Sequence, residues 1–141
     1  MDLEELYQTV ILDHARRPRN HGPLPEPCQK ARGDNPTCGD EVTVYLHVDS
    51  EGKIEGLKFD GQGCAISQAS ASLMTVKLKG RTKEEALGML YTFHDHLTGK
   101  TSEDLPGNFG DLIALAGVRK FPQRVKCATL SWNALKQLLQ E

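Results

Sequence analysis

The sequence predicts an α+β fold, in which an antiparallel sheet of about three strands packs against roughly four to five helices. Three observations support this fold class. A stretch with helical periodicity opens the chain, two alternating stretches joined by a turn follow at residues 41–60, and helical patterns fill most of the second half. A chain of 141 residues can bury a core without disulfides, so we expect a single domain spanning residues 1–141.

The first helix is expected over residues 2–14, where apolar side chains recur with the 3.6-residue period. Asp2 and Glu5 have the spacing of a capping box at its start. The apolar stripe indicates a core face, and a docking helix for a partner is the alternative. The prolines of residues 16–27 predict an irregular connector, and Cys28 beyond it is expected to be a buried thiol without a chemical role.

The sheet is expected from three short segments. Residues 41–48 alternate between apolar and polar side chains, which is typical of a half-buried strand. A turn at residues 49–52 leads to a returning strand at 53–60, in which Gly56 interrupts the alternation and predicts a β-bulge. Residues 30–34 are expected to add a short edge strand.

Two helices are expected after the sheet. Residues 65–79 are rich in alanine and serine, which favours a helix packed closely on the strands. Thr82 opens the next helix, with Glu85 completing a capping box. His94 and His96 lie on this second helix. Either can ligate a metal ion, but a solvated or packed histidine fits the same pattern.

The last part of the chain is expected to contain a polar loop and two more helices. The loop covers residues 98–107, and a short helix at 109–116 closes at Gly117. Pro122 precedes the final helix, whose apolar residues again follow the helical period.

Charge and composition exclude several classes of partner. The chain has 17 basic and 19 acidic residues, which gives no support for nucleic-acid or membrane-surface binding. It has no apolar stretch long enough to cross a bilayer, and its acidic start is unlike a signal peptide. We therefore expect a cytoplasmic protein. In that reducing compartment its four cysteines are metal ligands or reactive thiols rather than disulfides.

Four residues are predicted to form one site. Cys38 and Asp40 stand two positions apart, next to glycines and a proline. Cys64 follows the expected hairpin, and the outer ends of an antiparallel hairpin meet. Cys127 falls near the start of the last helix. We expect these side chains to converge around a single metal ion.

Three thiolates and a carboxylate suit tetrahedral Zn²⁺, and the same ligands can hold iron in an iron–sulfur cluster. With zinc they leave an excess of negative charge that a nearby cation should offset. Arg124 and Lys126 are the best placed cations, although a basic surface before a helix explains them equally well. A cysteine hydrolase is excluded, because no histidine has the context of a base and no nucleophile turn is present.

Three motifs, at residues 38–40, 61–67 and 124–132, resemble the NifU/IscU-type iron–sulfur cluster assembly proteins. The resemblance covers nearly the whole chain and is greatest to the SufU branch. Residues 121–125 replace the Leu-Pro-Pro-Val-Lys stretch of the housekeeping scaffolds, and Lys126 stands where those scaffolds have a histidine.

This resemblance implies a zinc-bound acceptor and carrier of persulfide sulfur, serving a PLP-dependent cysteine desulfurase of the SufS type. The positions that match the zinc ligands are Cys38, Asp40, Cys64 and Cys127. The resemblance further implies that Cys38 accepts the sulfur when a desulfurase histidine replaces it on the metal, and that Arg124 gates the site and balances its charge.

Two other functions are kept as alternatives. The first is a scaffold that assembles an iron or [2Fe–2S] centre on Cys38, Cys64 and Cys127 and transfers it. The second is a structural zinc-binding interaction domain. In the sulfur-transfer reading, downstream cluster-assembly proteins or apo-proteins receive the sulfur, and no independent catalytic centre is predicted on this chain.

Overall fold

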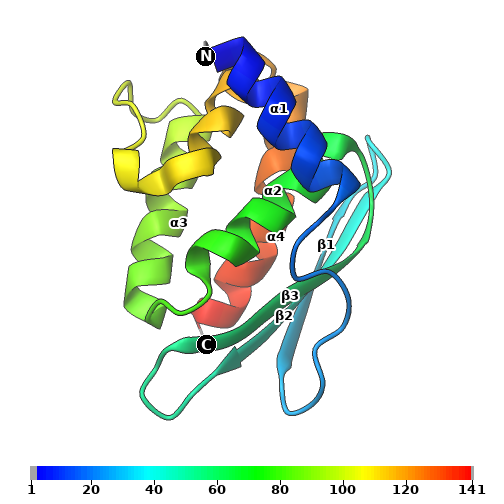
Figure 1. Ribbon diagram of the computed structural model, residues 1–141, viewed down its shortest axis with the longest axis vertical. Coiled ribbons are helices and arrows are strands. Elements are labelled where there is room, and N and C mark those ends of the chain that lie inside the picture. Colours follow the sequence, from blue (N-terminus) through cyan, green and yellow to red (C-terminus); the bar gives the residue numbers. More distant parts are fainter. Residues whose placement is uncertain (1–2, 141) are drawn as a thin grey trace.

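The computed structural model describes residues 3–140, which fold into an antiparallel sheet with helices on one face (Figure 1). In chain order the elements are α1 (Leu3–Arg16), β1 (Gln29–Asn35), β2 (Asp40–Val48), β3 (Ile54–Gln62), α2 (Ala65–Leu78), α3 (Lys83–Leu97), the 3₁₀ helix η1 (Gly107–Lys120) and α4 (Pro122–Leu139). The predicted α+β class is confirmed. Within the described residues, no helix is long and apolar enough to span a membrane.

The sheet is a meander with strand order β1-β2-β3, and the predicted edge strand is confirmed as β1. A bulge is present, but it lies at Glu55 rather than Gly56, since His47 pairs with Gly56 and Val48 with Ile54. Gly56 is needed for a different reason. A Cβ atom there would stand 2.9 Å from a methyl group of Leu24, so the glycine lets the connector lie directly on β3.

Helices α2 and α4 form the layer that covers the sheet, and α1, α3 and η1 pack around them (Figure 1). The small residues of α2 allow this close packing, as Ala69, Ser70 and Ala71 are all buried. At the α4 contact, Gly33 of β1 faces Leu130, where an added Cβ would lie 3.0 Å from the leucine Cδ1. Small residues at both contacts therefore bring the helices close to the strands.

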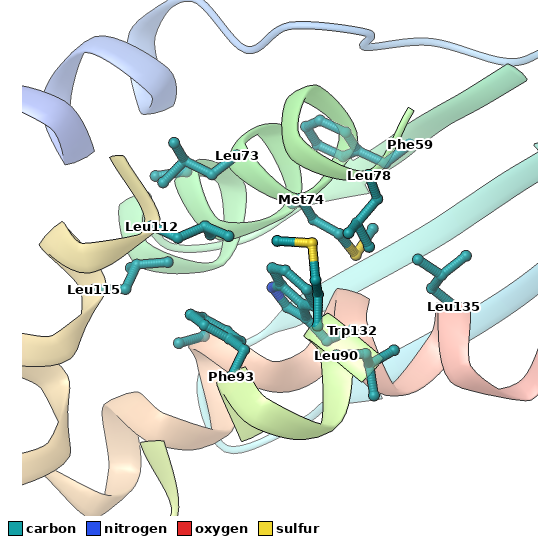
Figure 2. Packing of buried hydrophobic residues seen from close by; sticks show 14 of the residues in the cluster. Phe59, Leu73, Met74, Leu78, Leu90, Phe93, Leu112, Leu115, Trp132 and Leu135 are labelled. Carbon is teal, nitrogen blue, oxygen red and sulfur yellow. The ribbon is translucent and has the colours of Figure 1, made fainter. Parts of the chain in front are cut away.

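The core is centred on Trp132 of α4, which is fully buried. Its ring stacks on Phe93 of α3, with the centroids 4.3 Å apart. Figure 2 shows these two rings among side chains from α2 and η1, including Met74 and Leu112. This cluster fixes α4 against α2 and α3, and so fixes the helix that carries Cys127.

Helix α1 contributes to the core through Val10 and Ile11, which confirms the core interpretation of its apolar stripe. His14, also buried, hydrogen-bonds through Nδ1 to Ser72 Oγ of α2 at 2.8 Å. The helix continues to Arg16, two residues beyond the predicted end. The capping box predicted for its start involves Asp2, which lies outside the described residues.

Three further predictions need correction or extension. The short helix predicted at 109–116 is instead a 3₁₀ segment from Gly107 to Lys120, kinked at Gly110 where φ is +56°. Gly117 does not end this segment but lies inside it. Cys28 is half-buried rather than buried, with its thiol 3.5 Å from the Leu24 carbonyl. The capping box of Thr82 and Glu85 is present as predicted.

Candidate metal centre

Three distant segments meet at one end of the molecule: the β1–β2 loop, the start of α2 and the first half of α4 (Figure 1). Cys38 lies in the loop and is exposed. Cys64 is the N-cap of α2. Cys127 is buried on α4 and lies in the second turn, since the helix begins at Pro122. It therefore lies deeper in its helix than the sequence indicated.

Asp40 is the first residue of β2, which begins one residue before the strand expected at 41–48. Its side chain is buried, with a relative exposure of 1%. One carboxylate oxygen accepts a hydrogen bond from the Cys64 backbone N–H at 2.8 Å. The other oxygen lies 3.9 Å from the Cys64 sulfur. This carboxylate links the strand to the helix cap and brings the β1–β2 loop and Cys64 together.

The sulfur and oxygen atoms are close enough to share an ion. The Cys38 and Cys127 sulfurs are 3.3 Å apart. One ligand atom each from Cys38, Asp40 and Cys127 lies within 4.8 Å of the other two. Cys64 is not part of this trio, but its sulfur adjoins the Asp40 carboxylate.

These separations fit a tetrahedral zinc ion. With Zn–S bonds of about 2.3 Å, two thiolates on one ion stand roughly 3.8 Å apart. The Cys38 and Cys127 sulfurs, 3.3 Å apart, are slightly closer than that value. Thiolate ligands also favour zinc over harder ions such as Mg²⁺ and Ca²⁺. Cys38, Asp40 and Cys127 are therefore close enough to hold one metal ion, and the Cys64 sulfur lies beside the Asp40 carboxylate.

Without a cation, the buried Cys127 thiol holds its proton more tightly than a free thiol. Burial raises the pKa of the Cys127 thiol, and hydrogen bonds to Asp40, Cys38 and Cys64 raise it further. Negative groups gathered in a buried site oppose one another's ionisation. Because metal ligands must be deprotonated, binding of a divalent ion at this site releases protons.

Asn35 contacts the site and was not identified from the sequence. It ends β1, is 7% exposed, and its side-chain amide donates to the Cys127 sulfur at 3.6 Å. The sequence shows an amide side chain three residues before Cys38. Its burial and its contact with Cys127 follow only from the packing of β1 on α4.

Arg124 lies on α4, three residues before Cys127, and is exposed. Its guanidinium stacks over the Phe121 ring, 4.8 Å from the centroid. Burial raises the pKa of Tyr7, Arg124 opposes that shift, and Cys64 adds to it. The Tyr7 hydroxyl therefore lies within electrostatic reach of both Arg124 and the cysteine cluster.

Tyr7, Phe121 and Arg124 belong to a groove of about 530 Å³ between α1 and the end of η1. Lys126 is exposed.

His94 and His96 are not among the ligand atoms that converge on the site, and His96 Nδ1 is paired with the Glu103 carbonyl. Their place on α3 matches the packed or solvated alternative.

Gly63 controls the position of the Asp40 carboxylate. A Cβ atom at residue 63 would collide with Asp40 Oδ1, the oxygen that holds the Cys64 N–H. We expect Gly63→Ala to displace the carboxylate and lower zinc affinity by about 10–100-fold, measured by competition with a chromogenic chelator.

Gly88→Ala on α3 is the matched control, since a Cβ there meets no atom within 4 Å. It should leave zinc affinity unchanged and stabilise the helix by about 0.5–1 kcal/mol. Equal zinc affinity in both variants would show that the carboxylate does not depend on the space left by Gly63.

Residues 6–136 match the family described as the NifU-like N-terminal domain. The zinc-dependent sulfurtransferase SufU of Bacillus subtilis is 46% identical over 136 residues, which cover 96% of this chain and 90% of SufU. The iron–sulfur cluster assembly scaffold protein IscU of Streptococcus pyogenes is 44% identical over 138 residues, covering 98% of this chain and 85% of that protein.

A solved structure supports the same relationship. The putative iron–sulfur cluster assembly scaffold protein for the SUF system from Fervidobacterium islandicum superposes with a TM-score of 0.85 at 37% identity. The match covers 96% of this chain and 98% of that one. The relatives thus carry two kinds of description, sulfurtransferase and scaffold, on one fold.

Proposed function

Since this chain belongs to the NifU-like N-terminal domain family, we propose that it is a zinc-dependent sulfur carrier in iron–sulfur cluster assembly. In this role it accepts persulfide sulfur from a cysteine desulfurase and passes it on. Its greatest identity among the relatives above is to a protein described as a zinc-dependent sulfurtransferase. The proposed partner is a PLP-dependent desulfurase of the SufS type, and the proposed compartment is the cytoplasm.

The observation that carries this proposal is the unequal exposure of two neighbouring thiols. Cys38 is exposed on a loop, whereas Cys127, 3.3 Å away, is only 3% exposed. An incoming persulfide can reach Cys38 from solvent, while Asp40 and Cys127 are enclosed by the fold. We assign sulfur acceptance to Cys38 and anchoring to Asp40, Cys64 and Cys127.

A zinc ion bound here would keep the cysteines deprotonated and shield them from unwanted reaction. The protein's own residues supply the remaining features. The N-terminus of α2 favours negative charge at Cys64, which caps it. Arg124 supplies a positive charge at the rim and is proposed to offset the charge of the cluster and to gate access to it.

The test of this function combines metal content with sulfur transfer. The purified protein should hold about one zinc ion per chain, as a tetrahedral site with protein ligands only requires. Adding it to its cognate desulfurase and cysteine should increase desulfurase turnover and place sulfur on the chain, seen by intact mass. A zinc-loaded protein that receives no sulfur and leaves turnover unchanged would instead indicate a structural zinc-binding interaction domain.

A cluster scaffold is the second candidate, favoured by the IscU relative and by the three cysteines of the site. Anaerobic incubation with iron and sulfide would then yield a stable coloured species that activates an apo-protein. A colourless protein that keeps its zinc under the same conditions would reject the scaffold function.

A further inference from the structure

The cysteines of the site differ in the hydrogen bonds that their sulfurs accept. The Cys64 sulfur accepts the Ser67 backbone N–H at 3.4 Å. The Cys127 sulfur accepts the Asn35 side-chain amide at 3.6 Å. The Cys38 sulfur contacts the neighbouring Cys127 sulfur. Within residues 3–140, no N–H group donates a hydrogen bond to the Cys38 sulfur. The exposed cysteine is thus the one without a nitrogen donor.

The two donors differ in how they are supplied. The Ser67 N–H belongs to the first turn of α2, so any sequence that forms this helix places it at Cys64. The Asn35 donor is a side chain and depends on residue identity. It is held in place because Asn35 ends β1 opposite Asp40 and is buried beneath α4.

A hydrogen bond from N–H to a metal-bound thiolate withdraws charge from the sulfur. It orients the ligand and makes it less nucleophilic, and partners of this kind tune both the affinity and the reactivity of a metal site. A sulfur without such a bond keeps more negative charge, so it is the better nucleophile of the set. The pattern of donors therefore ranks the sulfurs before any partner arrives.

We propose that Asn35 is a positioning residue that fixes Cys127 as a permanent ligand, so that Cys38 is the sulfur that leaves and reacts. This inference rests on the proposed zinc-dependent sulfur transfer. The division between Cys38 and Cys127, whose sulfurs touch, comes from Asn35 together with burial.

The test replaces Asn35 by leucine, which has a similar shape and no donor. Zinc affinity, measured by chelator competition, should fall by about 10–100-fold. The cobalt-substituted protein gives a direct readout, because the sulfur-to-cobalt charge-transfer band moves to lower energy when a thiolate loses a hydrogen bond.

Thr129→Val is the matched control. Thr129 is buried on α4 two residues from Cys127, and its hydroxyl bonds to the Val125 carbonyl rather than to sulfur. It should leave the charge-transfer band and zinc affinity unchanged. Circular dichroism at the assay temperature shows which variants are folded. If Asn35→Leu is unfolded, Asn35→Ser, too short to reach the sulfur, is measured in its place.

The inference is overturned if folded Asn35 variants keep both the wild-type zinc affinity and the wild-type cobalt spectrum. It is also overturned if Thr129→Val shifts the band as much as Asn35→Leu does. Failure of the proposed function looks different, since the wild-type protein itself would then lack zinc or would receive no sulfur from the desulfurase.

Discussion

Cys38→Ser is expected to reduce sulfur acceptance from the desulfurase by at least about 100-fold, because a serine hydroxyl is not ionised and cannot form a persulfide. Burial should prevent Cys127 from substituting for the lost thiol, since only 3% of that residue is exposed. The measurement is desulfurase turnover with cysteine as substrate, together with intact mass of the acceptor. The variant should also retain its fold, as Cys38 lies on a loop outside the core.

Cys28→Ser is the matched control for the loss of a thiol. Cys28 is half-buried near the Leu24 carbonyl and takes no part in the cluster. This variant should accept sulfur at the wild-type rate. If Cys38→Ser still accepts sulfur and Cys127→Ser does not, the acceptor role belongs to Cys127, and the proposed assignment of Cys38 is wrong.

The approach of Asp40 and Cys64 could be predicted from the sequence, because it follows from local geometry. The two strands between Asp40 and Cys64 alternate clearly, and a hairpin must bring its outer ends together. The N-cap position of Cys64 follows from the start of α2. No local rule places Cys127, because its approach depends on how α4 packs across the sheet. Its inclusion in the site rested on residue type and family resemblance.

Other features of the site depend on contacts between distant segments. Gly63 must be a glycine because the Asp40 carboxylate occupies the space of a Cβ. Asn35 matters because β1 lies under α4 and brings its amide to a sulfur. Neither residue type by itself indicates such a contact. The same limit explains the misplaced bulge, since Gly56 accommodates Leu24 rather than an irregular strand pairing.

The errors in the helical half have a similar origin. The capping box of Thr82 and Glu85 is a local motif with its own hydrogen bonds, and it was predicted correctly. Residues 107–120 instead form a 3₁₀ segment that is kinked at Gly110, a shape set by the helices around it. The periodicity of α4 identified the helix but not its most important core residue. That residue is Trp132, the last position of the motif at residues 124–132.

That tryptophan provides the largest expected effect on stability. Trp132→Ala should lower the free energy of unfolding by about 3–5 kcal/mol, because it leaves a large cavity at a fully buried position. It also removes the stacking on Phe93 and the hydrogen bond from Nε1 to Ser70 Oγ at 3.0 Å. Since small domains are stable by only about 5–15 kcal/mol, this is a substantial fraction of the total. Urea denaturation followed by circular dichroism measures the change.

Two further variants separate the causes. Trp132→Phe keeps a ring against Phe93 but loses the indole N–H. It should cost about 0.5–1.5 kcal/mol for the lost hydrogen bond, together with a packing loss smaller than that of Trp132→Ala. Tyr91→Ala removes a ring that is 43% exposed, together with its surface contacts to Lys136 and Gln140, and should cost no more than about 1 kcal/mol. If Trp132→Ala costs no more than Tyr91→Ala, α4 is not held by this cluster. The position of Cys127 would then have to be fixed at the metal site itself, by its ligands and by Asn35.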